Sequence, residues 1–395
     1  MTARAKKIVF NLVRVVICVA ALWIVVRGVT LNDHIHLQSG ETVMGDVLPS
    51  DEPSEIHVRQ PKTGETIVIP SEEIARDQDG ALRITYGLKS AWRNSRGWLL
   101  LAALLIHFPV VLPQALRFRW LLGAQGIRVG YWECLKLSFA GNFLNFATPL
   151  GSHAGDAFKA YFASLHTDQK TEAVTTVVLD RIIGLATLLL AAALITLLAS
   201  RQAKLAVLQP YVFGLLAVAI GGLIFYFSPL FPRLFAWDAW SARVPALAHF
   251  RRIDQAARNL AGRPRLWIAA VLLTAFLQFL ALAAYFTVAL AMNMRADASS
   301  VLEYFAYFYT GTLVQALPGP PQGLGTVELT YRYFFAPYGS PSQIVCMALA
   351  IRVVVLLCAL PGLLVTLTGG YRPKAFVPAR DGTVLPQSPL QEPVL

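Results

Sequence analysis

The sequence has few charged residues. Asp, Glu, Lys and Arg make up 14% of its 395 residues, whereas an average soluble domain carries roughly 25%. Hydrophobic residues make up 56%. This composition excludes an ordinary soluble domain and is typical of a polytopic membrane protein.

Acidic residues are scarcer than basic ones, and the formal net charge is +11. The basic residues stand in short links between apolar runs, as they do in the cytoplasmic loops of membrane proteins. We therefore interpret the charge as a sign of topology and expect no nucleic-acid partner. The residues concerned are Arg117, Arg119, Arg243, Arg251, Arg252, Arg258, Arg263 and Arg265.

Cysteines and enzyme motifs are also scarce. Cys18, Cys134, Cys346 and Cys358 all lie in apolar segments, and none is at metal-binding or redox spacing. The sequence has no nucleophile elbow, phosphate-binding glycine loop or H-E-x-x-H motif. We therefore expect no disulfide, no metal, no cofactor and no catalytic residue.

The chain divides into four parts. Residues 1–29 have a basic start and an apolar core without an A-x-A-like cleavage site, which predicts a membrane anchor helix with a cytoplasmic N-terminus. Residues 30–90 alternate between apolar and polar and are interrupted by turn residues, which predicts a small extracytoplasmic β domain, with a barrel as one candidate. The apolar part spans 97–370, and 371–395 form a cytoplasmic tail.

Two of the apolar runs are too short to cross a membrane as straight helices. Runs 131–147 and 301–318 fall below the roughly 20 residues that a span needs, and each leads into a segment rich in glycine and proline. We predict that each enters the membrane, breaks and returns as a re-entrant hairpin. The breaks contain Pro149, Gly151 and Gly155 in the first hairpin, and Pro321, Gly323 and Gly325 in the second. The other runs are 97–116, 173–199, 208–228, 266–292 and 341–367.

The same pattern of residues surrounds both hairpins. The glutamate-to-glycine spacing is 8 in both copies, the proline-to-acid spacing is 7 in both, and the acid-to-arginine spacing is 25 and 24. Counting spans from a cytoplasmic N-terminus gives the two copies opposite orientations, so the pattern predicts an inverted repeat of the kind found in transporters. The copies are Glu133, Gly141, Pro149, Gly151, Asp156 and Arg181, and Glu303, Gly311, Pro321, Gly323, Glu328 and Arg352.

Arg181 and Arg352 are the main candidate ligand-binding residues. They lie about 12 and 17 Å along their helices from opposite faces, and charged residues at such depths usually face a partner or a wet cavity. A guanidinium can bind phosphate through two hydrogen bonds, so an anionic headgroup is a natural ligand. The alternative is structural pairing of Arg181 with Asp180 or Asp156, and of Arg352 with Glu328. Their matched positions favour the functional interpretation.

Other polar residues near the breaks leave alternatives open. Asp156 and Glu328 can cap exposed amides at a helix N-terminus, or couple transport to an ion. Lys159 and Arg332 are expected to extend toward the nearest interface. A further three, Asn142, Asn145 and Gln315, could line a polar path or bond between helices.

Three motifs, in order, resemble the flippase-like membrane domain family, which is the transmembrane part of lysylphosphatidylglycerol synthases and stand-alone relatives. They are the break at Pro149, Gly155 and Asp156, the pair Asp180–Arg181, and the second break at Gly323, Gly325 and Glu328. The resemblance covers about 97–370. It implies movement of a lipid with a charged headgroup, or of a polyprenyl-linked precursor, between leaflets. The synthases' aminoacyl-transferase domain has no counterpart here, and 30–90 lies outside the family core.

The sequence therefore predicts an all-α polytopic protein of the inner (cytoplasmic) membrane, with an inverted repeat, two re-entrant hairpins and a small β domain after the first helix. Both termini are expected in the cytoplasm. The expected partner is an anionic or zwitterionic lipid bound by Arg181, Arg352, Asp156, Glu328 and Asp180, and 30–90 could bind an extracytoplasmic partner. Two alternatives remain, a membrane-embedded transferase acting on a lipid-linked substrate and a non-catalytic scaffold.

Overall fold

The structure is a computed structural model. It describes residues 30–48, 55–61, 63–76, 82–148, 152–165, 167–198, 206–207, 209–228, 254–255, 257–258, 262–317 and 320–367. The predicted anchor helix 1–29 and tail 371–395, together with Pro149 and Gly151 of the first break, lie outside these residues.

Residues 33–85 form an antiparallel five-stranded sheet, as the alternating pattern predicts. The spatial order is β4-β3-β2-β1-β5, and the segment after β4 also pairs with the end of β1 and with the start of β5, through the bridges Leu37–Ile74 and Arg76–Leu82. Ile35, Val58, Ile69 and Ile74 form its small core. The strands are β1 (Asp33–His36), β2 (Thr42–Leu48), β3 (Glu55–Arg59), β4 (Thr66–Pro70) and β5 (Ile84–Thr85).

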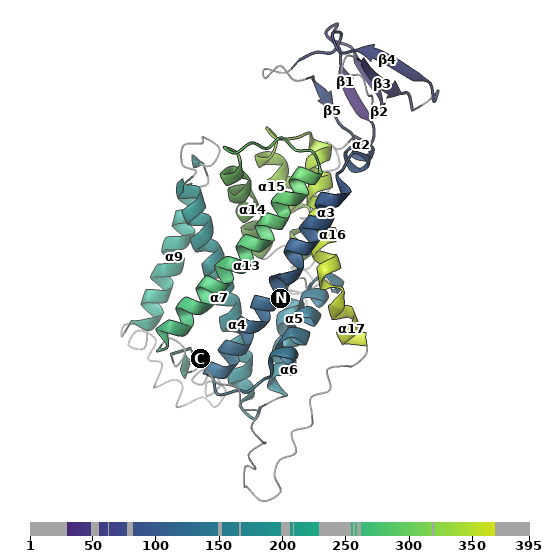
Figure 1. The fold of residues 1–395 in the computed structure, drawn as a ribbon. Coiled ribbons are helices and arrows are strands. Elements are labelled where there is room, and N and C mark those ends of the chain that lie inside the picture. Colours follow the sequence, from purple (N-terminus) through teal and green to yellow (C-terminus); the bar gives the residue numbers. More distant parts are fainter. Residues whose placement is uncertain are drawn as a thin grey trace, which may run out of the picture.

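The remainder is helical (Figure 1). Among the residues that the structure describes, five segments are long and apolar enough to cross a membrane, namely Gly97–Ala124, Lys170–Leu198, Gln209–Tyr226, Pro264–Ala291 and Pro341–Ala359. This confirms a polytopic helical membrane protein with a small β region near its N-terminus. The helices are α2 (Leu88–Arg93), α3 (Gly97–His107), α4 (Val111–Ala124), α5 (Tyr131–Ala147), α6 (Ser152–Ser164), α7 (Lys170–Leu198), α9 (Gln209–Phe227), α13 (Pro264–Ala291), α14 (Val301–Ala316), α15 (Thr326–Phe334), α16 (Pro341–Ala359) and α17 (Pro361–Leu367).

Local signals explain where several helices begin and break. Ser340 caps α16 by accepting a hydrogen bond from the Gln343 backbone N–H at 3.2 Å, and Pro341 occupies the first turn, where no amide donor is needed. A short 3-10 segment that contains Pro109 separates α3 from α4. Pro361 begins α17, so the run 341–367 is two helices rather than one.

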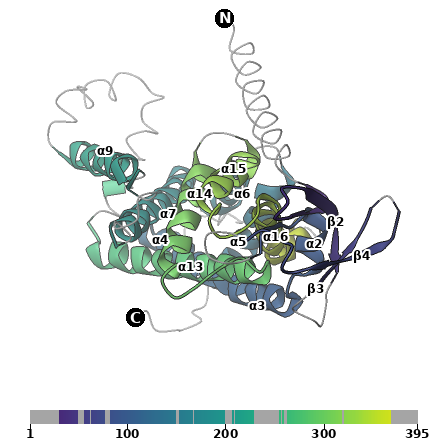
Figure 2. The same cartoon turned by 90° about the horizontal axis from the view of Figure 1, so that it is seen from above.

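Both short apolar runs are the first limb of a helical pair. Helix α5 packs on α6, and α14 packs on α15. In Figure 1 the α5–α6 pair lies in the lower half of the bundle and the α14–α15 pair in the upper half, on the side of the sheet. From above, α9 lies at the edge of the bundle opposite the sheet (Figure 2).

The sheet is attached to the helices through one buried carboxylate. Asp33 is fully buried and accepts hydrogen bonds from the Val47 N–H at 2.7 Å, the Gly87 N–H at 2.6 Å and the Ser90 hydroxyl at 2.7 Å. It therefore joins β1 and β2 to α2 and to the residue that precedes that helix. Next to it, the Ser340 hydroxyl donates to the Tyr86 carbonyl at 3.1 Å, which ties the same end of the sheet to α16.

We expect Asp33→Ala to loosen the sheet from the helices. The change leaves three donors without an acceptor, two of them buried, at a cost of roughly 1–3 kcal/mol for each buried one. Hydrogen–deuterium exchange over residues 30–90 should rise sharply, while exchange in α7 and α13 stays as in the wild type. The exposed Glu65→Ala is the matched control. Wild-type protection in Asp33→Ala would contradict this role.

Candidate functional site

A polar cavity of about 300 Å³ lies inside the helical bundle. Residues of α4, α5, α6, α7, α13 and α14 line it, so both helical pairs contribute to its wall. Its volume is at the lower end of the range for small-molecule pockets. Five charged side chains lie in the wall, namely Arg117, Asp156, Lys159, Asp180 and Arg181.

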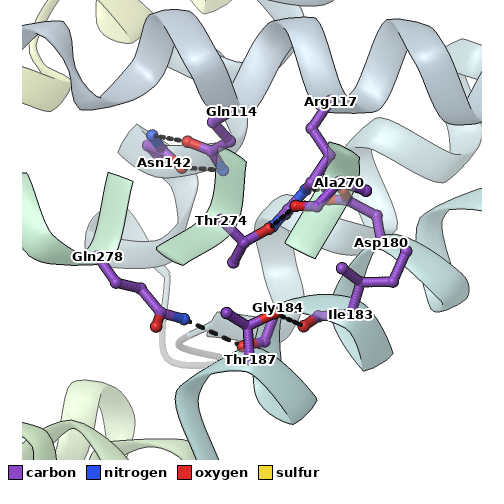
Figure 3. A network of polar contacts seen from close by, with 10 residues as sticks. All are labelled: Gln114, Arg117, Asn142, Asp180, Ile183, Gly184, Thr187, Ala270, Thr274 and Gln278. Atoms are coloured by element: carbon purple, nitrogen blue, oxygen red, sulfur yellow. Dashed lines mark hydrogen bonds and ion pairs between the residues drawn. The ribbon is translucent and has the colours of Figure 1, made fainter. Parts of the chain in front are cut away.

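Arg117 and Asp180 form a buried ion pair on one side of the cavity (Figure 3). Their side chains are 7% and 9% exposed, and Arg117 Nε lies 2.7 Å from Asp180 Oδ1. Arg117 also donates to the Thr274 hydroxyl of α13 at 2.6 Å. The pair therefore joins α4, α7 and α13, and it uses the carboxylate that sequence analysis offered as a headgroup ligand or as a partner for Arg181.

The two matched arginines pair with the two matched acids. Arg181 Nη1 lies 3.4 Å from Asp156 Oδ2, and Arg352 Nε lies 2.6 Å from Glu328 Oε1. In each copy, an acid on the second limb of the helical pair contacts an arginine on the following long helix. These are two of the structural pairings that the sequence left open.

The two pairs differ in environment. The Arg181 and Asp156 side chains are each 31% exposed, and both line the cavity. The Glu328 side chain is only 4% exposed, and its other oxygen accepts the Gly325 N–H at 2.7 Å. Glu328 and Arg352 are not among the residues that line this cavity. The first pair is thus open and loose, and the second is tight and closed.

Each helical pair satisfies the backbone at its break with a side chain. In the second, Glu328 caps Gly325, as one of the two sequence interpretations held, and Arg352 Nη1 donates to the Gln322 carbonyl at 3.1 Å. In the first, the Asn145 side chain accepts the Gly155 N–H at 2.8 Å. Asp156 is therefore free of the capping task and contacts Arg181.

Gln322 connects the two breaks. Its Nε2 donates to the Asn145 carbonyl at 2.9 Å, and its Oε1 accepts from Gln315 at 2.6 Å. The residue has a φ of 54°, a left-handed conformation that is unusual for a side chain other than glycine or asparagine. These contacts hold it there, and through them the second break meets the last turn of α5 beside the cavity.

Side-chain amides form much of the remaining polar wall. Gln114 and Asn142 exchange hydrogen bonds of 3.0 and 3.4 Å, and Gln278 donates to the Gly184 carbonyl at 3.2 Å (Figure 3). Asn145 and Gln315 also line the cavity. Asn142, Asn145 and Gln315 thus line a polar cavity, and each bonds to another segment, while the path through the membrane stays a prediction.

Glycines permit the close packing of each helical pair. A Cβ on Gly155 would lie 2.2 Å from the Gly141 carbonyl oxygen, and a Cβ on Gly311 would lie 2.2 Å from Tyr331 Cε1. Gly141 and Gly311 are the matched glycines of the two copies. In the second break, Gly323 and Gly325 have φ values of 63° and 85°, which glycine adopts readily.

Two sequence expectations about basic residues were wrong. Arg117 was assigned to a cytoplasmic link, but it is 6% exposed inside the bundle, while Arg119 is exposed. Residues two apart on a helix point to nearly opposite sides, so the two arginines separate. Lys159 was expected to extend to the interface, but it is 4% exposed and lines the cavity. The narrow contact between α5 and α6 keeps it inside.

The comparison with protein families agrees with the membrane-protein fold and with the two polar breaks. Residues 86–362, more than half of the chain, match the model of the lysylphosphatidylglycerol synthase TM region. The chain belongs to this family. The match begins just before α2 and so extends past the 97 boundary expected from sequence, while strands β1 to β5 precede it. The comparison with curated proteins found no match.

We expect Gly155→Ala to disrupt the first helical pair, because the added methyl group would meet the backbone of α5. The melting temperature in detergent should fall by several degrees. Gly123→Ala is the matched control, since a Cβ there has no neighbour within 4 Å, and alanine favours a helix by about 1 kcal/mol over glycine. Equal melting temperatures for the two variants would contradict the close approach.

The two arginines should differ in their effect on stability. Arg352→Ala leaves the buried Glu328 carboxylate without its counter-ion, which typically costs about 3–5 kcal/mol. Arg181→Ala removes a half-exposed pair of roughly 0–1 kcal/mol. Melting curves of the two variants should show a large loss for the first and a small one for the second. The reverse order would contradict the assignment of the closed and open pairs.

Proposed function

We propose that this protein moves a lipid with a charged headgroup, or a polyprenyl-linked precursor, between the leaflets of the cytoplasmic membrane. The observation that carries the proposal is the charged cavity of about 300 Å³ among helices of membrane-spanning length. Charged groups inside an apolar bundle are unfavourable unless they serve a partner or a wet path. A headgroup that must pass through the membrane is such a partner.

The two helical pairs would act as re-entrant hairpins of an inverted repeat. Their acid–arginine pairs occupy matched positions, and the pairs approach the middle from opposite ends of the bundle (Figure 1). In transporters of this kind, one repeat opens while the other closes around a central site. A transport cycle of this kind would include a state in which the Arg181–Asp156 contact is loose and the Arg352–Glu328 contact is tight.

The predicted headgroup ligands would then have different roles. Arg181 is the direct phosphate contact, and Asp156 holds it when no headgroup is bound. Asp180 keeps Arg117 in the wall through their ion pair. Arg352 and Glu328 keep the second hairpin closed, and they would exchange roles with Arg181 and Asp156 when the cavity opens to the other side.

The two rival functions predict different behaviour. A membrane-embedded transferase would need a nucleotide or a divalent cation, so activity that depends on either would favour it. A scaffold would keep its function when both arginines are replaced and lose it when residues 30–90 are deleted. The charged cavity argues against the scaffold, which needs no charged groups inside the bundle, and the dependence on nucleotide or cation separates the other two functions.

The test is lipid translocation in proteoliposomes that contain a fluorescent anionic lipid. Arg181→Ala should slow translocation roughly tenfold or more, since it removes a charge-assisted contact to the headgroup. Arg119→Ala, which changes an exposed arginine of α4, is the matched control and should translocate at the wild-type rate. An unchanged rate in Arg181→Ala, with the protein folded, would overturn the assigned role.

A further inference from the structure

Gln322 is held in an unfavourable backbone conformation. Its φ and ψ are 54° and 22°, in the left-handed region, which costs free energy for a residue with a Cβ. Among the described residues, Asn293 is the one other non-glycine residue with a positive φ, and it lies exposed just after α13. Asparagine tolerates this conformation better than glutamine does. A glutamine stays in it only where neighbouring groups hold it there.

Three hydrogen bonds hold Gln322, and each comes from a different helix. Its Nε2 donates to the Asn145 carbonyl, in the last turn of α5, at 2.9 Å. Its Oε1 accepts from Gln315 of α14 at 2.6 Å, and its backbone carbonyl accepts from Arg352 Nη1 of α16 at 3.1 Å. Of these helices, α5 belongs to the first helical pair and α14 to the second. The position of α5 therefore acts on the second break through the Gln322 side chain.

The Gln322 backbone is also one of the two groups that hold the Arg352 guanidinium. Arg352 bonds the Gln322 carbonyl through Nη1 and Glu328 Oε1 through Nε, while its Nη2 is buried with no hydrogen-bond partner among the described residues. A return of Gln322 to an ordinary, negative φ would rotate this carbonyl away from Arg352. The guanidinium would then have Glu328 as its one acceptor, so the closed pair would loosen.

We propose that Gln322 is a positioning residue that keeps the second helical pair closed only while α5 occupies its present place. When α5 moves, the Asn145 carbonyl is withdrawn, Gln322 relaxes to an ordinary backbone conformation, and Arg352 loses its carbonyl acceptor. Gln322 is thus a two-state element whose equilibrium both helical pairs bias. The inference rests on the proposed transport function and deepens it, because it names the residue that keeps the two pairs from opening together.

The first test is Gln322→Gly, which separates the side-chain contacts from the backbone shape, since glycine adopts the left-handed conformation readily. Hydrogen–deuterium exchange of the full-length chain in mild detergent should rise about tenfold or more at Gly325 and the first turn of α15, because two hydrogen bonds are lost. The matched control is Asn293→Gly, at a left-handed residue whose side chain donates to the Asn94 carbonyl at 2.7 Å. It should leave exchange in α15 unchanged.

A second perturbation tests the connection to the first pair. Asn145→Ala removes the side chain that accepts the Gly155 N–H at 2.8 Å, so it loosens the end of α5 without changing any residue of the second break. Exchange in the first turn of α15 should rise about threefold or more when Gln322 is present, within the range for coupled residues. In the Gln322→Gly background, the same change should cause no further rise.

Wild-type exchange in α15 of a folded Gln322→Gly would overturn the inference, because the backbone shape alone would then keep the pair closed. An Asn145→Ala effect that is absent, or equal in both backgrounds, would also overturn it. Melting curves and gel filtration show whether each variant is folded.

Should Gln322→Gly not fold, Gln322→Asn takes its place. Asparagine tolerates the left-handed conformation, but its amide is one methylene shorter, so exchange in α15 should again rise. Wild-type exchange in this variant would count against the inference in the same way.

Because exchange is measured without transport, the two proposals can fail separately. Lipid translocation by a protein whose two pairs exchange independently removes the inference and keeps the function. Coupled exchange through Gln322 in a protein that translocates no lipid does the opposite.

Discussion

Helices that end inside the bundle leave backbone amides and carbonyls that apolar neighbours cannot satisfy, and this constraint governs the centre of the molecule. Asn145 accepts the free Gly155 amide of the first pair, and Glu328 accepts the Gly325 amide of the second. Arg352 then compensates the Glu328 charge and bonds the Gln322 carbonyl. The polar groups that make the breaks possible also bring ionic side chains to the middle of the bundle.

The two helical pairs satisfy these backbone groups with different side chains, and this difference leaves the first acid–arginine pair partly exposed at the cavity. In the second copy one carboxylate serves as both cap and counter-ion, which uses both of its oxygens and leaves the pair closed. In the first copy an asparagine provides the cap, so Asp156 and Arg181 remain half exposed beside the cavity. Nearly the same spacing along the chain therefore gives one structural pair and one accessible pair.

The sheet is held at the end of the bundle where the second pair lies (Figure 1). Asp33 joins it to α2, and Ser340 joins it to the start of α16, the helix that carries Arg352. A rearrangement of the second pair that moved α16 would therefore be transmitted to the sheet through these hydrogen bonds. This coupling gives the β unit a mechanical connection to the membrane part in addition to any partner of its own.

The sequence by itself determined the membrane class, the family, the approximate positions of the strands and long helices, and the matched acid–arginine residues, because apolar runs, turn residues and repeat spacing are local signals. Only the tertiary structure decided which acid pairs with which arginine, that Lys159 and Arg117 face inward, and that Gln322 joins the two breaks. Arg117 meets Thr274 across 157 residues and Gln322 meets Asn145 across 177. Contacts over such separations depend on how the helices pack, and no spacing along the chain specifies that.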